Sequence, residues 1–196
     1  MRSSLSFAIT AFNHPLTVRI PGAGVNRHRR VAATVAGVAT GTPATVALTK
    51  AGIAHTLHPY EHDPRSQAYG DEAAAALGVD PARLFKTLIA TVDGTLACAV
   101  VPVAARLDLK AFAASLGGKR AELAEPAAAA RATGYVVGGI SPVGQKGRRR
   151  IVVDASARTF ATVFVSAGKR GLQVELAPGD LIAVTSAATA SIATVP

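Results

Sequence analysis

The sequence predicts a single mixed α+β domain, built on a curved mixed β-sheet or a partly closed barrel with helices outside it. The apolar content of 49% in 196 residues is enough to bury one full core. Helical and strand-like segments alternate irregularly, which argues against a regular βαβ winding. A hairpin signal between two strands indicates that part of the sheet is antiparallel. The pattern leaves open whether this sheet closes.

Residues 1–41 are predicted to be a basic, disordered N-terminal extension, and the folded domain is expected to span residues 42–196. The first 40 residues hold five arginines and no acidic residue, and they lack sustained periodicity. Three explanations stay open: a stretch translated from a misplaced start, which we favour, an RNA-binding tail, or an organellar presequence. The formal net charge of the chain is +9. Without this extension the chain still holds sixteen basic and twelve acidic residues, and this excess of positive charge is compatible with a polyanionic partner.

Caps and turn residues define the first half of the domain. Thr42 followed by Pro43 is typical of a helix start, because a threonine side chain caps free N–H groups and proline fits the first turn. Asp93-Gly94 is typical of a two-residue hairpin turn. These signals predict a helix ending before residue 52, a strand at 55–60, a helix at 71–77, a helical turn at 80–85, and hairpin strands at 87–92 and 95–101.

Glycines end the two helices expected in the second half, since glycine readily adopts the left-handed conformation that closes a helix. Gly117 ends a helix that starts at Asp108, and Gly134 ends one that starts at Pro126. Runs rich in Val, Ile, Phe and Thr predict the strands. The expected elements are strands at 150–153, 159–165 and 172–176, then a short helical turn at 178–182 and a final apolar stretch.

Several classes of protein are disfavoured. The longest apolar run, residues 96–103, is far shorter than the ~20 residues that a membrane helix needs, so we expect a soluble, cytoplasmic protein with no membrane contact. Cys98 is the only cysteine, which excludes an intrachain disulfide, and its apolar neighbours predict an inert core residue. The histidines at 55, 58 and 62 lack metal-site spacing, so no metal site is expected.

Two glycine-bearing loops are candidate ligand sites. In residues 134–147, five of fourteen residues are glycine, and main-chain N–H groups in such a loop can converge on an anion or a carbonyl oxygen. The alternative is a surface turn. Residues 166–171 carry Lys169 and Arg170 between two glycines, which is typical of a phosphate-contacting turn, although the segment does not match a nucleotide-hydrolysing P-loop.

Four single residues are further candidates, each with a structural alternative. Lys86 stands at the entry of an apolar strand, where it either holds an anion or extends to solvent. Tyr60 and Tyr69 flank one loop and either stack on a base or pin the loop to the core. Asp154 ends a strand and either faces the pocket or caps a turn. Around His62, residues 60–64 form either an acid–base site or a turn, and we favour the turn.

Together these segments resemble the YbaK family of aminoacyl-tRNA deacylases, which is similar to the editing domain inserted in bacterial prolyl-tRNA synthetases. The resemblance runs from about residue 42 to the C-terminus. It rests on residues 60–64, 70–72, 86–88, 107–110, 133–146 and 160–181, in the same order. Within this superfamily, the segment Gly-Gly-Ile-Ser-Pro-Val-Gly-Gln-Lys at 138–146 looks most like the free-standing Cys-tRNA(Pro) deacylases.

The resemblance implies hydrolysis of the ester that joins a wrong amino acid to tRNA(Pro), without a cofactor. The cysteine thiol of the substrate would attack its own ester carbonyl. We expect Lys86 to be central to the site, with main-chain N–H groups near Gly138 and Gly139 stabilising the oxyanion. The expected substrate-binding residues are Tyr60, Tyr69, Thr87, Ile140, Ser141, Pro142, Asp154, Ser166, Gly168 and Lys169.

Alternative functions stay open at this point. One is a deacylase for alanine or another small amino acid, because pocket volume cannot be inferred from sequence. Another is a non-catalytic module that binds tRNA or a nucleotide, or that associates with a synthetase. The expected partner of a deacylase is tRNA(Pro) that carries a noncognate amino acid, with prolyl-tRNA synthetase as a further candidate.

Overall fold

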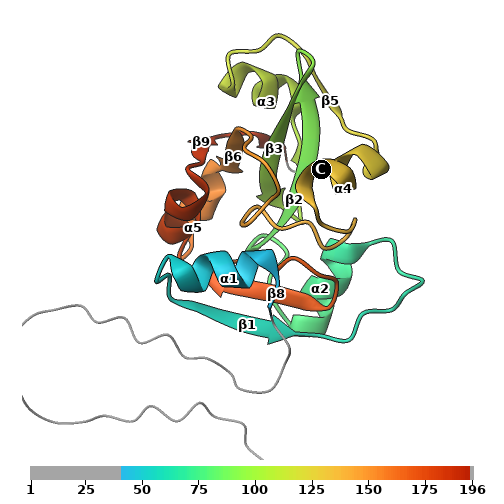
Figure 1. The fold of residues 1–196 in the computed structure, drawn as a ribbon, viewed down its shortest axis with the longest axis vertical. Helices are drawn as coiled ribbons and strands as arrows, with labels where there is room; N and C mark the ends of the chain where they lie inside the picture. The colour runs from blue at the N-terminus through green and yellow to red at the C-terminus, as the bar shows by residue number, and fades with distance from the viewer. Residues whose placement is uncertain (1–40, 195–196) are drawn as a thin grey trace, which may run out of the picture.

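The computed structural model describes residues 41–194 (Figure 1), so the predicted extension, apart from residue 41, lies outside the described part. The helices are α1 (Pro43–Lys50), α2 (Tyr69–Leu77), α3 (Leu109–Ser115), α4 (Pro126–Thr133), α5 (Pro178–Thr185) and the 3₁₀-helix η1 (Ala155–Thr159). The strands are β1 (His55–Pro59), β2 (Leu84–Val92), β3 (Thr95–Pro102), β4 (Arg106–Leu107), β5 (Ala121–Leu123), β6 (Ile151–Asp154), β7 (Val163–Ser166), β8 (Leu172–Leu176), β9 (Ala188–Ala190) and β10 (Ala193–Thr194).

A mixed sheet forms the centre of the domain, and it is open. Its strand order is β1-β8-β7-β2-β3-β6-β9, with β5 as a third partner of β2, and β4 and β10 form a separate pair. Strand β2 pairs parallel with β7, and β6 pairs parallel with both β3 and β9, while the other pairs in the sheet are antiparallel. Since β1 and β9 each pair on one side only, the described residues form no closed barrel.

The β2-β3 hairpin is the longest pairing in the sheet, and Figure 1 shows it extending from the centre of the domain to the end where α3 lies. Its turn is Asp93-Gly94, with φ of 47° and 84°, the left-handed backbone that matches the twist of a two-residue hairpin. The Asp93 carboxylate accepts hydrogen bonds from the main-chain N–H groups of Lys119 and Arg120, at 2.8 and 3.0 Å. The predicted hairpin is confirmed, and its turn also anchors the segment that enters β5.

Helices cover both faces of the sheet. On one face, α1, α4 and α5 pack on a core cluster that includes Phe85, Val165 and Leu181. On the other, α3 places Phe112 against β3, and α2 packs its alanines on Leu84. Both faces of β2 are therefore covered, which leaves the edge opposite β3 as the route by which a ligand can reach this strand.

Three boundaries differ from the sequence prediction by three residues or more. Residues 84 and 85 belong to β2 instead of a helical turn, because they pair with Phe164 and Val165, which are distant in sequence. Thr159 lies in η1, so β7 starts only at Val163. Helix α5 extends through Thr185, beyond the predicted turn. The short strands β4, β5, β9 and β10 were not predicted, since three or fewer residues carry no periodic signal.

A polar cluster ties the strands at the β1 edge together. The Glu175 carboxylate on β8 accepts hydrogen bonds from Thr162, at 2.5 Å, and from Arg83, and it lies 2.9 Å from Nε2 of His58 on β1. Burial raises the pKa of the Glu175 carboxyl, but the bonds from Thr162 and His58 and the charge of Arg83 outweigh burial, so its pKa lies below the usual value. The cluster joins residues that are up to 117 positions apart in the chain.

We expect Glu175→Gln to destabilise the domain by about 1–2 kcal/mol at neutral pH, because charge-assisted hydrogen bonds are lost. The pKa of the Glu175 carboxyl is lower in the folded than in the unfolded protein. The stability that the carboxylate contributes is therefore fully present above the unfolded-state pKa, and it is lost as the pH falls through the folded-state pKa. The difference between the two proteins in urea unfolding should therefore shrink below about pH 4. The exposed Glu122→Gln serves as control, and an equal loss in that variant would contradict the assignment.

Candidate functional site

The site begins with an interruption in the pairing of β2. One edge of this strand pairs with β3 along its whole length. Along the other edge, β7 pairs only with Leu84 and Phe85, and β5 pairs only with residues 90–92. The intervening residues, 86–89, have no strand beside them, and a cavity of about 400 Å³ lies at this gap. A volume of this size is typical of small-molecule sites.

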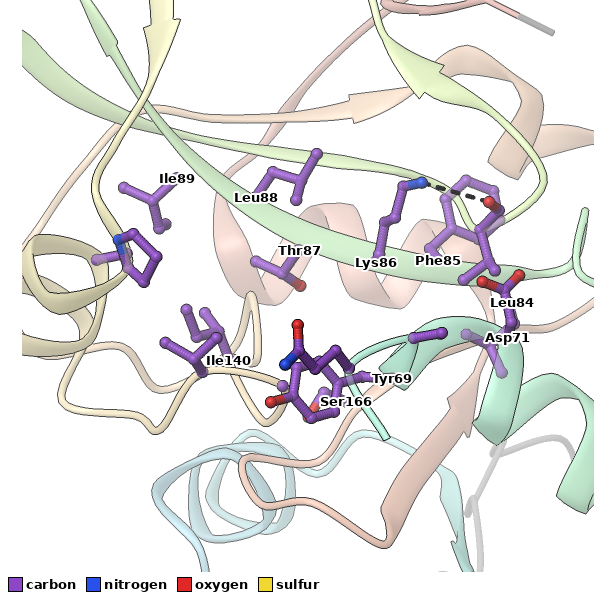
Figure 2. A pocket seen from close by; sticks show the side chains of 18 of the residues that line it. Tyr69, Asp71, Leu84, Phe85, Lys86, Thr87, Leu88, Ile89, Ile140 and Ser166 are labelled. Atoms are coloured by element: carbon purple, nitrogen blue, oxygen red, sulfur yellow. Dashed lines mark hydrogen bonds between the residues drawn. The ribbon is translucent and has the colours of Figure 1, made fainter. Parts of the chain in front are cut away.

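The cavity extends around the open edge of β2, so it is lined by both faces of the strand. Lys86 and Thr87 leave the strand in opposite directions (Figure 2). Lys86 and Asp71 lie toward one end of the cavity, beside Leu84 and Phe85, and the other end is apolar, with Ile89 and Ile140. A ligand with one polar and one apolar part fits such a cavity.

The Lys86 amine is held in a fixed position. Its Nζ donates hydrogen bonds to the main-chain oxygens of Ala105, at 2.7 Å, and Val103, at 3.3 Å. Burial lowers the pKa of this amine, while the carboxylate of Asp71 opposes the shift and the guanidinium of Arg106 adds to it. Because an ammonium has three donors, one remains for a ligand in the cavity.

Two buried polar atoms at the cavity have no hydrogen-bond partner within residues 41–194. They are Oγ1 of Thr87 and Oε1 of Gln173, on β2 and β8. Gln173 is only 6% exposed. The hydroxyl of Thr87 points toward the side of the cavity where Tyr69 and Ser166 lie (Figure 2). Since buried polar atoms are normally paired, both are candidates to bind a ligand.

The glycine loop packs closely on its neighbours. A Cβ on Gly138, whose φ is +81°, would lie 2.6 Å from the ring of Tyr69, and one on Gly139 would lie 2.9 Å from the main chain of Lys169. Arg170 fastens this contact, because its Nε donates to Val137 O at 2.8 Å and its guanidinium lies 5.0 Å from the centre of the Tyr69 ring. These two glycines therefore serve close packing of the two loops and of Tyr69.

Main-chain donors in this loop are fewer than the sequence suggested. The N–H of Gly139 already donates to Val136 O at 2.9 Å, and it does not line the cavity. Gly138 does line the cavity, and its N–H has no hydrogen-bond partner in the described part of the chain. Of the two expected oxyanion donors, only Gly138 keeps a geometry that suits this role.

The structure brings together six of the thirteen predicted site residues. Those that line the cavity are Lys86, Thr87, Tyr69, Gly138, Ile140 and Ser166.

The other predicted site residues do not line this cavity. Tyr60 donates its main-chain N–H to Gly171 O, and Gly168 packs on Tyr135. Pro142 faces a second hollow on the other side of the loop, beside Arg148. Ser141 is buried, and its Oγ accepts the N–H of Val143. Lys169 packs on Gly139.

Asp154 does not line the cavity. One carboxylate oxygen accepts the main-chain N–H of Ser156 and so caps η1, and the other accepts those of Ile192 and Ala193, at 2.8 and 2.9 Å. These bonds use both oxygens to fasten the C-terminal segment. The capping interpretation of Asp154 therefore describes this structure better than a place in the pocket.

The segment around His62 is a turn held by Glu72. The Glu72 carboxylate lies 2.9 Å from Nδ1 of His62 and accepts the N–H of Asp63 at 2.6 Å. The His62 ring lies 5.8 Å from that of Tyr69, centre to centre. The favoured turn interpretation agrees with this geometry, and the turn supports Tyr69 from behind the cavity wall.

Other sequence expectations concern sites away from the cavity. Cys98 is fully buried and burial raises its pKa to about 12, as expected for an inert core thiol. Within residues 41–194, His, Cys, Asp and Glu side chains form no group of three that could hold a metal ion. In the same range, every helix is too short or too polar to cross a bilayer.

Gln173 lines the cavity but was not among the predicted site residues. In the segment Leu-Gln-Val-Glu-Leu, alternation predicts that Gln173 and Glu175 face solvent. Gln173 is instead buried, because β8 is paired on both sides and the side chain lies in the wall of the cavity. A polar residue inside a strand of apolar neighbours is the signal that was present.

Comparison with known proteins identifies the family. Residues 64–184, more than half of the chain, match the aminoacyl-tRNA editing domain. The chain is 37% identical over 125 residues to EbsC of Enterococcus faecalis, whose provisional name is Cys-tRNA(Pro)/Cys-tRNA(Cys) deacylase; the match covers 63% of this chain and 76% of that protein.

Two solved structures share the fold. The crystal structure of a hypothetical protein matches with 26% identity and a TM-score of 0.71, over 78% of this chain and all of that one. A second, provisionally described as a trans-editing enzyme for prolyl-tRNA synthetase, matches with 22% identity and a TM-score of 0.71, over 81% of this chain and 99% of that one. The family resemblance and the fold class inferred from the motifs are confirmed.

We expect Gly138→Ala to destabilise the domain by about 1–3 kcal/mol, because the new methyl group would meet the Tyr69 ring and adopt an unfavourable φ. Gly147→Ala is the matched control, since its φ is +75° but the surrounding space is open. Urea unfolding of both variants separates the contact from the backbone strain. Equal losses in the two variants would mean that Tyr69 does not press on Gly138.

Proposed function

The chain belongs to the aminoacyl-tRNA editing domain family and is an aminoacyl-tRNA deacylase, and we propose that its substrate is tRNA(Pro) mischarged with cysteine. The relative in Enterococcus faecalis bears a Cys-tRNA(Pro)/Cys-tRNA(Cys) deacylase name at 37% identity. The reaction is hydrolysis of the ester between the amino acid and the terminal ribose. We expect it in the cytoplasm, where tRNA is charged, with prolyl-tRNA synthetase as a candidate partner.

The observation that carries this proposal is the cavity at the open edge of β2. A lysine ammonium, a buried hydroxyl and a main-chain N–H line one space of about 400 Å³, at Lys86, Thr87 and Gly138. An ammonium group suits the negative charge of the tRNA end, and the N–H of Gly138 suits the oxygen that becomes negative during ester cleavage. The apolar end near Ile89 and Ile140 offers a surface for an aromatic base or for an apolar part of the amino acid.

Among the described lining residues of the cavity, no side-chain hydroxyl is hydrogen-bonded to an amine, imidazole or carboxylate that could act as its base. No histidine or cysteine lines it, and the Ser166 hydroxyl accepts the N–H of Gly168 at 3.3 Å. This supports a mechanism in which the substrate thiol attacks its own ester carbonyl. The new S–C bond then replaces the C–O bond to the ribose, the ribose oxygen leaves with a proton, and water hydrolyses the resulting thioester.

In this mechanism the protein contributes positioning. A thiol held against its own carbonyl has an effective concentration on the order of 10⁵ M or more in well-oriented cases. Lys86 would fix the ribose or its phosphate, because its amine is already oriented by two carbonyl groups. Gly138 would stabilise the oxyanion through a donor held rigid by Tyr69.

We predict that Lys86→Met lowers kcat/KM for Cys-tRNA(Pro) by about 100-fold or more, because the cavity loses its cation while the length of the side chain is kept. Release of free cysteine from charged tRNA measures this. Lys110→Met, on the exposed side of α3, is the matched control and should be as active as the unmodified protein. If the Lys86 variant keeps its melting temperature and its full activity, the site is assigned wrongly.

The thiol mechanism predicts that tRNA(Pro) charged with serine or alanine is deacylated at least about 100-fold more slowly than Cys-tRNA(Pro). A hydroxyl is a weaker nucleophile than a thiol, and a methyl group cannot attack at all. The measurement is single-turnover deacylation with saturating protein, which separates chemistry from binding. Equal rates for alanine and cysteine would instead support an attacking water and an alanine-editing deacylase.

A further inference from the structure

The open edge of β2 presents unpaired main-chain groups to the cavity. Val92 and Thr95 flank the two-residue turn, so even-numbered residues of β2 direct their N–H and C=O groups to β3. Odd-numbered residues direct theirs to the other edge: Arg83 O accepts from β7, and Ile89 O accepts the N–H of Ala124 at 2.9 Å. Between these bonds, the N–H and C=O of Thr87 and the N–H of Ile89 point into the gap. Main-chain groups in this position require a partner.

Gln173 adds a side-chain acceptor to this edge. Its Oε1 is buried without a partner in the described residues, and the side chain lies in the wall of the same cavity. The Tyr60 side chain lies beside that of Gln173. This contact holds the amide in place and leaves one of its terminal atoms for a ligand.

The arrangement of donors and acceptors selects the chemical class of the ligand. Two acceptors, Thr87 O and Gln173 Oε1, and two donors, the N–H groups of Thr87 and Ile89, belong to residues that line the cavity. A phosphate offers acceptors only, so the two oxygens would repel it. An α-aminoacyl group matches, because its amino group donates and its carbonyl accepts, as in a peptide that adds to a strand edge.

We propose that the open edge of β2 and Gln173 form the subsite for the aminoacyl group of the substrate, with its α-amino nitrogen donating to Thr87 O and Gln173 Oε1. The inference rests on the proposed function and adds which atoms hold the amino acid. The aminoacyl carbonyl then lies along the donors of β2, beside the Gly138 loop. Lys86, which leaves the strand in the opposite direction from Thr87, remains for the tRNA part (Figure 2).

The test uses a stable ligand, adenosine that carries cysteine on its ribose through an amide, and a des-amino analogue in which mercaptopropionyl replaces cysteinyl. Calorimetry measures the affinity of each for the full chain. The unmodified protein should bind the cysteinyl ligand about 10- to 100-fold more tightly than the des-amino analogue. The Gln173→Met variant should bind the cysteinyl ligand about tenfold or more weakly than the unmodified protein does. Its affinity for the des-amino analogue should fall by less than about twofold.

Gln173→Glu is the matched variant, because both of its terminal oxygens accept hydrogen bonds. The Gln173→Glu variant should still bind the cysteinyl ligand more tightly than the des-amino analogue. If Gln173 had only a structural role, its replacement would lower the affinity for both ligands equally. Equal losses in Gln173→Met for the two ligands, or no preference in the unmodified protein, would overturn the proposed subsite. Melting temperatures of both variants confirm that they fold.

A deacylation assay on Cys-tRNA(Pro) separates this inference from the proposed function. If the unmodified protein shows the amino-group preference but does not deacylate Cys-tRNA(Pro), the subsite stands and the proposed substrate is wrong. If it deacylates Cys-tRNA(Pro) but shows no amino-group preference, the substrate stands and the subsite is wrong.

Discussion

The candidate site depends on one constraint, the incomplete pairing of a central strand. Strand β2 needs partners along two edges, but β7 reaches only its first residues and β5 only its last ones. The open stretch leaves main-chain groups unpaired in the middle of a covered sheet, and it lets one cavity reach side chains from both faces of the strand. Without that gap, Lys86 and Thr87 would lie on opposite sides of a closed sheet and could not act on one ligand.

The two glycine-bearing loops are coupled to this gap through Tyr69. The ring of Tyr69 lies against Gly138 on one side and below the guanidinium of Arg170 on another, and the turn at His62 and Glu72 supports it. Residues from three separate segments thereby form one wall. The main role of these glycines is to let neighbouring segments pack in close contact, and not to offer several N–H groups to an anion. In the two loops, Gly138 is the glycine that also lines the cavity.

Local signals predicted most of the elements because each has a short-range cause. Thr42 caps α1 by accepting the N–H of Thr45 at 3.2 Å, and Asp93-Gly94 forms the hairpin turn as its conformational preferences require. Boundaries failed where pairing is long-range. Phe85 joins a strand because β7 lies beside it, and Gln173 is buried in the cavity wall on a face that alternation assigns to solvent.

By itself, the sequence determined the fold class, the hairpin, the inert Cys98 and, through the order of its motifs, the family. It also placed Lys86, Thr87, Tyr69 and Gly138 among the site residues. Only the tertiary structure decided which glycine keeps a free donor, that Asp154 fastens the C-terminal segment, and that Gln173 faces the cavity. The physical reason is that motifs record which residue types lie near each other in the chain, whereas hydrogen-bond saturation and burial depend on segments brought together by folding.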